Sequence, residues 1–178
     1  MQQEPDLTLV EQACNGDTDS FTELCRRYYP AMVAIAHSII GDRHLAEDAA
    51  QQTFAKAVRK MSNLKSKNKF AAWLAAICRN VALDLTNNKE RFQSAEDLSM
   101  IAAESQENDI TEVVKEALNR LSAPAKEIIF LRYYDGMTYE QISAVLGISE
   151  QAINGRLRRA KKKMANYLRR NSFGKVQL

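Results

Sequence analysis

The chain has few of the residues that interrupt helices. Its 178 residues include only three Pro and six Gly, and runs of β-branched residues are rare. Because Pro and Gly are the least favourable residues in a helix interior, their scarcity favours helices. No internal repeat, strand hairpin or Gly-rich phosphate loop occurs, and hydrophobic residues make up 46% of the chain, enough to bury a core. We expect an all-α protein.

Metal, membrane and catalytic signals are also missing. Cys14, Cys25 and Cys78 are widely spaced and no CxxC occurs, which disfavours structural zinc and a disulfide framework. No apolar run reaches the length of a membrane span, and the N-terminus lacks the apolar core of a signal peptide. His37 and His44 have no carboxylate cluster at metal spacing, and no nucleophile–base motif is present. We expect a cytoplasmic protein that is not an enzyme, with no cofactor, metal or membrane insertion.

Charge is distributed unevenly along the chain. The net charge is +3, yet residues 156–178 carry nine Lys and Arg and no acid. The other 155 residues hold 16 basic and 22 acidic side chains, a net of −6. Basic charge confined to one end predicts a polyanion partner there, with a merely solvated basic tail as the alternative.

The stretch Thr138–Arg159 has the pattern of two short helices joined by a tight turn. Thr138 and Gln141 have the spacing of a capping box, and Ser149 can cap the second helix. Gly147 stands at the turn, where a positive φ carries no Cβ penalty. This arrangement predicts a helix-turn-helix, although an ordinary helical hairpin would share several of its features.

The second of these helices has one apolar side and one polar side. Its apolar stripe recurs at steps of three and four: Ile153, Leu157, Ala160, Met164 and Leu168. Amides and guanidinium groups on the other side suit reading of the DNA major groove. Candidate base-edge contacts are Gln151, Asn154 and Arg158, while Arg156, Arg159 and Lys162 are candidate phosphate contacts. Thr138 and Gly155 complete the DNA-binding candidates, Gly155 because it lets the backbone approach closely.

The first half shows further helical periods. We expect a short helix starting at Thr8 and a longer one capped by Asp17 and ended by Gly41, which Pro30 should kink or divide. A third helix should run from Asp42 to about Met61. After a polar loop, Phe70 to Leu85 should form a fourth.

Two domains follow from these periods. Residues 1–88 should form the first domain and residues 110–172 the second. Residues 89–109 should form a flexible acidic linker with local helix around 98–103, and residues 173–178 a tail. Pro124 fits the first turn of a helix in the second domain. A linker of this length reaches roughly 65 Å when extended, so the domains could touch one duplex at separated sites.

The order of these pieces resembles the extracytoplasmic-function (ECF) sigma factors of the sigma-70 family. AEDAAQQTFAKAV (46–58) is similar to the helix that grips core RNA polymerase, and FAAWLAAICRNVALD (70–84) to the segment that reads and opens the promoter −10 element. LSAPAKEIIFLRYYDGMTYEQISAVLGIS (121–149) is similar to the domain that reads the −35 element. The resemblance covers nearly the whole chain outside the linker.

The resemblance implies a role for each half. Contacts to the polymerase clamp helices fall on Asp48, Gln51, Gln52 and Phe54, although Phe54 could equally be a core residue. Contacts to −10 DNA would be made by Asn63, Lys65, Lys67, Asn68, Lys69, Arg79 and Asn80. Arg79 and Asn80 could equally stabilise the fold. Phe70 and Trp73, beside the loop that would capture a base, are better explained as core residues.

The function implied is a dissociable subunit that directs core RNA polymerase to promoters and promotes −10 melting. Its partners would be promoter DNA, the clamp helices of the largest polymerase subunit, the flap of the second subunit, and an anti-sigma factor. The alternative is a standalone helix-turn-helix transcription regulator. The chain departs from the family pattern at four places. Gln51-Gln52 replaces Gln-Glu, and Asn154-Gly155 replaces Lys/Arg-Ser. Ala71 stands where a basic or polar residue is usual, and residues 86–88 are less basic than the usual end of that helix.

Overall fold

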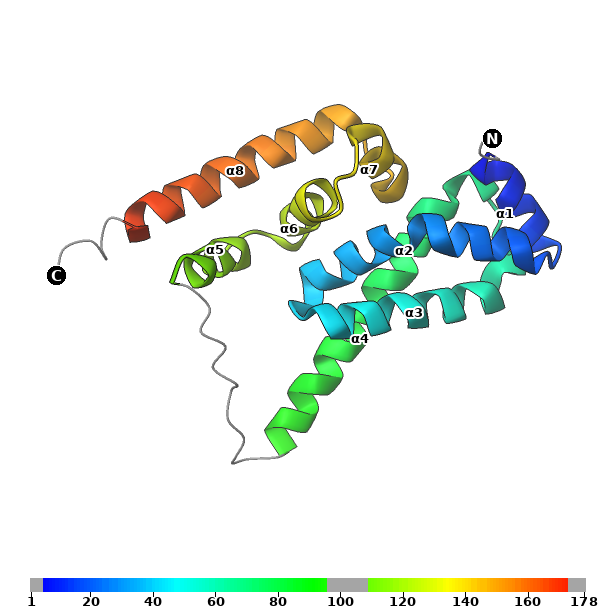
Figure 1. Ribbon diagram of the computed structural model, residues 1–178, viewed down its shortest axis with the longest axis horizontal. Coiled ribbons are helices and arrows are strands. Elements are labelled where there is room, and N and C mark those ends of the chain that lie inside the picture. The colour runs from blue at the N-terminus through cyan, green and yellow to red at the C-terminus, as the bar shows by residue number, and fades with distance from the viewer. Residues whose placement is uncertain (1–4, 96–108, 173–178) are drawn as a thin grey trace.

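Helices make up the computed structural model, which describes residues 5–95 and 109–172 (Figure 1). No strand occurs within these two ranges, and the all-α prediction is confirmed. The acidic stretch expected to hold local helix around 98–103, and the tail from 173, lie outside the described residues. None of the described helices has an apolar stretch long enough to cross a membrane.

The N-terminal half consists of α1 (Asp6–Cys14), α2 (Thr18–Ile40), α3 (Arg43–Lys60) and α4 (Phe70–Ala95). As predicted, the Asp17 carboxylate caps α2 by accepting from the Asp19 and Ser20 amides. Gly41, at φ +77°, ends α2, and Asp42 caps α3 by accepting from the Leu45 amide at 3.1 Å. Two short turns, η1 (Met61–Asn63) and η2 (Lys67–Lys69), lead from α3 to α4.

The start of α1 differs from the prediction. The helix begins at Asp6, ahead of Thr8, and its N-cap is Pro5 in extended conformation, without a side-chain cap. Asp6 explains the earlier start, because its carboxylate accepts hydrogen bonds from Arg27 at 2.6 Å and from the Tyr28 hydroxyl at 2.6 Å. These tertiary contacts hold the first turn in place of a local cap.

Pro30 does not divide α2, which runs unbroken through it. A proline removes the hydrogen bond to the carbonyl four residues earlier, here that of Arg26. Both Pro30 and Arg26 are exposed, so water can satisfy that carbonyl. Residues 31–36 just beyond it are buried, and their packing holds the helix together.

Helix α4 runs further than the domain boundary expected at Asn88, because it continues to Ala95. The C-terminal half then begins with α5 (Asp109–Asn119) and α6 (Ala123–Ile129). Pro124 lies in the first turn of α6, as predicted. A wider π-helical turn, η3 (Phe130–Tyr134), leads to α7 (Tyr139–Leu146) and the long α8 (Glu150–Ser172).

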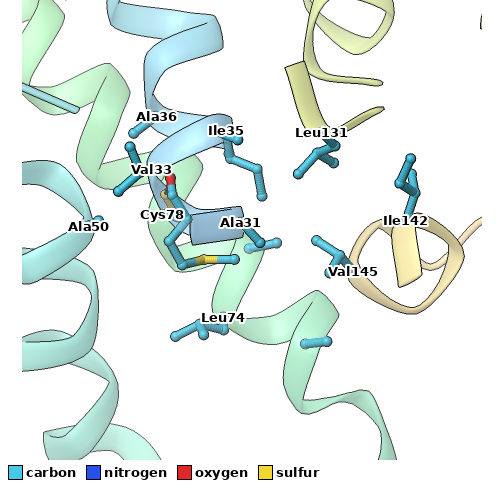
Figure 2. Packing of buried hydrophobic residues seen from close by; sticks show 14 of the residues in the cluster. Ala31, Val33, Ile35, Ala36, Ala50, Leu74, Cys78, Leu131, Ile142 and Val145 are labelled. Atoms are coloured by element: carbon cyan, nitrogen blue, oxygen red, sulfur yellow. Dashed lines mark hydrogen bonds between the residues drawn. The ribbon is translucent and has the colours of Figure 1, made fainter. Parts of the chain in front are cut away.

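The two halves share one hydrophobic core. Helices α2 and α4 pack against α6, η3 and α7, while α3 lies on the far side of the N-terminal half (Figure 1). Leu131 and Val145 of the C-terminal half lie opposite Ile35 and Ala31 of α2 (Figure 2). The sequence predicted two helical domains joined by an acidic linker, and none of its signals indicated that the two domains pack together.

Candidate nucleic-acid interface

The helix-turn-helix has the local geometry that its sequence predicts. The Thr138 hydroxyl accepts from the Gln141 amide at 3.2 Å, and the Gln141 side chain accepts from the Thr138 amide at 2.8 Å, which completes the capping box. Gly147 ends α7 at φ +67°, in the left-handed region that favours glycine. The Ser149 hydroxyl accepts from the Ala152 amide at the start of α8. These bonds set where α7 and α8 begin, and Gly147 lets the chain turn between them.

Helix α8 presents a polar face to solvent. Ile153, Leu157 and Ala160 are buried, and Met164 and Leu168 are half-buried, so the apolar stripe packs on the C-terminal half. The residues predicted to reach base edges are all exposed: Gln151, Asn154 and Arg158. Exposed Lys162 follows Arg158 by four residues and lies on the same face.

A second basic group lies on the flank of α8. Arg156, Arg159 and Lys163 line a pocket of about 380 Å³ between α8 and the first turn of α6. Arg156 and Gly155 are half-buried, whereas Arg159 is exposed. The two predicted phosphate contacts Arg156 and Arg159 therefore flank the base-reading face, and the structure adds Lys163 beside them. Lys163 was not among the residues predicted from the sequence, although its spacing of four from Arg159 could have suggested it.

The candidate −10 loop is largely open to solvent. Asn63, Lys65, Asn68 and Lys69 are exposed and Lys67 is half-buried. Phe70 directly after it is only 3% exposed, and its ring lies 5.4 Å from that of Tyr28 and 5.9 Å from that of Trp73. The explanation of Phe70 as a core residue therefore holds, and the loop amides and ammonium groups are the accessible part.

Arg79 and Asn80 differ in their surroundings. The Asn80 side chain is exposed on α4. The Arg79 Nε donates a hydrogen bond of 2.8 Å to Glu127 Oε1 in α6, so Arg79 bridges the two halves. Glu127 was not predicted from the sequence, although an acid inside an otherwise apolar helix face was a signal of a buried charge partner.

The predicted polymerase-binding residues lie along α3. Asp48, Gln51 and Gln52 are exposed. Phe54 is 8% exposed and stacks on Tyr29 with ring centroids 6.3 Å apart, which matches the alternative that it is a core residue. The accessible face of α3 is thus made of one acid and two amides.

Two titratable groups lie near the contact between the halves. Burial lowers the pKa of His37, and the Arg43 charge lowers it further. The His37 ring lies 5.0 Å from that of Phe130 and 5.2 Å from that of Tyr134. Burial raises the pKa of Asp135, at the end of η3, to about 6. Within the described ranges no group of three or more His, Cys, Asp and Glu is placed to hold a metal ion.

Because the pKa of Asp135 is raised, we expect Asp135→Asn to increase folding stability by an amount that depends on pH. The carboxylate ionises at about 6 in the folded chain but near 3.8 when unfolded, so folding stability falls as pH rises through this window. At pH 7.5 the substitution should stabilise the fold by about 1 kcal/mol, after allowance for solvent screening. Thermal unfolding from pH 4 to pH 7.5 measures it. A gain that stays the same at pH 4 would show that the charge of Asp135 is not the cause.

Comparison with known proteins places both halves in one family. Sigma-70 region 2 matches residues 24–92 and sigma-70 region 4 matches residues 111–164. The ECF RNA polymerase sigma factor SigE of Mycolicibacterium smegmatis is 26% identical over 98% of this chain and 72% of its own length. The region 2 match covers the half that a standalone helix-turn-helix regulator would lack.

Solved structures agree with these matches. CnrH, in complex with the cytosolic domain of CnrY, has a TM-score of 0.62 and 26% identity, covering 93% of this chain and 98% of its own. RpoE of Bartonella quintana, in complex with the anti-sigma factor NepR, has a TM-score of 0.56 and 28% identity. The match covers 86% of this chain and 99% of the RpoE chain. The chain therefore belongs to the sigma-70 family, as an RNA polymerase sigma factor of the extracytoplasmic-function type.

Proposed function

We propose a division of labour between the two halves in transcription initiation. The N-terminal half binds core RNA polymerase and captures an unpaired strand at the −10 element, while α8 of the C-terminal half reads the −35 element. The observation that carries the proposal is the exposed amide and guanidinium face of α8, set on a capped helix-turn-helix in a chain that also contains region 2.

For the −35 element, the exposed face of α8 enters the major groove. Arg158 suits a bidentate contact with guanine, and Asn154 and Gln151 suit adenine. Arg156, Arg159 and Lys163, on the flank, neutralise backbone phosphates and fix the register without reading sequence. The Asn154-Gly155 pair is the place where this protein's promoter preference should depart from that of relatives with Lys/Arg-Ser.

For the −10 element, the loop between α3 and α4 supplies ammonium groups and amides. Lys65 and Lys69 attract the backbone of a displaced strand, and Asn63 and Asn68 can hydrogen-bond the edge of an unstacked base. Buried Phe70, directly after the loop, packs against the half-buried rings of Tyr28 and Trp73 and anchors the start of α4 there. Arg79 and Asn80 extend this surface along α4.

For polymerase binding, Asp48, Gln51 and Gln52 on α3 pack against the clamp helices of the largest subunit. Phe54, buried against Tyr29, holds that helix in position. The C-terminal half binds the flap of the second subunit. An anti-sigma factor is a further partner, because RpoE of Bartonella quintana, which is similar in fold, is found in complex with the anti-sigma factor NepR.

Removing the loop lysines tests the −10 role. Lys65, Lys67 and Lys69 replaced together by Ala should lower the fraction of melted promoter, because three backbone contacts to the displaced strand are lost. Contacts to single strands contribute about 0.7 to the salt slope each, so the log–log slope should fall by about 2. Permanganate reactivity of −10 thymines, measured against salt at saturating core polymerase, reports both quantities.

The matched control removes the same charge from α3. Lys56, Arg59 and Lys60 are exposed cations, and their replacement by Ala should leave the salt slope of melting unchanged. Equal effects of the two triple variants would mean that net charge, and not the loop, governs melting. An unchanged slope in the loop variant would contradict the proposed −10 contact.

A further inference from the structure

Helix α8 continues beyond the part of the chain that matches sigma-70 region 4. That match ends at residue 164, whereas α8 runs to Ser172. Residues 165–172, called the α8 extension below, add about two helical turns to the second helix of the helix-turn-helix. They include Arg169 and Arg170, both exposed, and no acid. The extension therefore prolongs the basic part of α8.

Contacts with α5 hold the extension in place. The Tyr167 hydroxyl donates to the Glu116 carboxylate, and the guanidinium carbon of Arg120 lies 4.5 Å from the centre of the Tyr167 ring. One turn earlier, the Lys163 ammonium donates to the Arg120 carbonyl. Because helix ends fray unless other contacts hold them, this bracing gives the extension a fixed direction relative to the helix-turn-helix.

The extension continues both rows of polar and basic side chains on α8. On the face proposed to read bases, Arg169 follows Lys162 by seven residues. On the flank with the proposed phosphate contacts, Arg170 follows Lys163 by the same step. Side chains seven residues apart lie on one face, because seven residues make about two helical turns. Each row thus ends in an arginine that lies beyond the region 4 match.

The Arg169 side chain lies along its row. Its Nη2 donates to the Asn166 side-chain oxygen at 2.8 Å, and its Nε donates to the Ala165 carbonyl at 3.4 Å. Both acceptors lie one turn earlier in α8, so the guanidinium is directed back toward Lys162. A guanidinium has five N–H donors, and these two bonds leave donors for a phosphate.

The length of α8 exceeds the width of the groove that it is proposed to enter. At about 1.5 Å per residue, Gln151 and Arg158 are roughly 10 Å apart along the axis, close to the roughly 12 Å width of the major groove. Arg169 lies about 16 Å beyond Arg158. When the base-reading face occupies the −35 element, the extension therefore lies past the edge of the groove, beside the backbone of the flanking duplex.

The exposed surface of the extension suits DNA better than a protein partner. Between residues 161 and 171 the exposed side chains are Lys, Arg, Asn and Ala. Protein interfaces centre on well-packed aromatic or aliphatic anchors, whereas sequence-independent DNA binding depends on Lys and Arg. In the described part of the chain the large exposed hydrophobic residues all lie outside α8: Leu7, Val58, Leu83, Tyr133 and Tyr134.

We propose that the α8 extension is a second DNA contact, in which Arg169 and Arg170 neutralise backbone phosphates of the duplex beside the −35 element. The inference rests on the proposed role of α8 at that element. Because phosphates are the same in every sequence, the extension raises the affinity for all promoters alike. It leaves the choice among −35 sequences to the part of α8 that enters the groove.

Removing both arginines tests the contact in the intact holoenzyme. Arg169→Ala, Arg170→Ala should weaken binding to a promoter with duplex on both sides of the −35 element by about tenfold at about 100 mM salt. The log–log salt slope should fall by about 2, because each phosphate contact contributes about 0.9. Fluorescence anisotropy of labelled promoter, titrated with holoenzyme, measures both. The order of preference in a −35 promoter library should stay the same.

Hydroxyl-radical footprinting locates the contact. The unaltered holoenzyme should protect sugars just outside the −35 element on one flank, and the double alanine variant should lose this protection while it keeps the protection inside the element. An unchanged salt slope, or a loss of protection only inside the element, would overturn the second contact. Absence of any −35-dependent binding by the unaltered holoenzyme would instead overturn the proposed function of α8.

Two control variants separate local charge from net charge and from structure. Arg59→Ala, Lys60→Ala removes an adjacent pair of exposed cations from α3 and should leave the salt slope unchanged. An equal fall in slope would mean that net charge governs binding, and the proposal would be wrong. Arg169→Lys, Arg170→Lys keeps both charges and should retain the slope and most of the affinity. Binding as weak as that of the alanine variant would show that the arginines act only by holding α8.

Discussion

Replacing Leu131 by alanine is expected to lower the free energy of unfolding by about 3–5 kcal/mol. The Leu131 side chain is fully buried in the core that both halves share. Its removal leaves a cavity between elements that cannot close without shifting η3 against α2. Chemical denaturation followed by circular dichroism measures the change. The helical signal should be lost in a single transition, because the two halves unfold together.

An exposed leucine provides the matched control for this prediction. Leu83 on α4 is 49% exposed, and Leu83→Ala should change stability by no more than about 0.5 kcal/mol. A loss below about 1 kcal/mol in Leu131→Ala would contradict the burial on which the shared core depends. Two separate transitions in the unaltered chain would show that the halves are not coupled in solution.

Replacing Arg158 by alanine is expected to change which −35 sequences the protein prefers. Arg158 is exposed on α8, seven residues after Gln151 on the same face. A bidentate contact of Arg to guanine is worth about 1–3 kcal/mol of discrimination, so preference at one base position should fall by about fivefold to a hundredfold. Run-off transcription from a promoter library randomised across the −35 element measures this preference.

Lys162→Ala is the control for the Arg158 prediction. Lys162 lies one turn further along α8, where it suits a phosphate contact. Its replacement should weaken all promoters about equally and reduce the salt slope by about 1. Uniform loss in Arg158→Ala would assign Arg158 to the backbone as well, and base reading would then rest on Gln151 and Asn154.

Local signals in the sequence predicted the helix-turn-helix well. The capping box of Thr138 and Gln141, the glycine at 147 and the serine at 149 act within a few residues, so their geometry follows from the residues themselves. The apolar stripe of α8 likewise fixed which side chains are exposed. The start of α1 was not predictable in this way, because Asp6 is held by Arg27 and Tyr28 from another helix.

The contact between the halves could not be predicted from the sequence, because apolar residues that pack across it look the same as residues that pack within one half. Leu131 and Val145 are apolar at helical spacing, and each would look the same if it packed only within its own half. The linker also obscured the packing, since a polar acidic stretch predicts separable domains whether or not they touch. Glu127, an acid on an apolar helix face, did indicate a buried charge partner. That partner, Arg79, lies 48 residues away in the sequence, so it could not be identified from local spacing.

Addition of the purified chain to sigma-free core polymerase tests the central claim most directly. Run-off transcription from a library of genomic promoter fragments should yield transcripts from a subset of promoters, and only when both core and chain are present. Binding of the chain to core, measured in the same reactions, should saturate. Absence of both core binding and promoter-dependent transcripts would contradict the account.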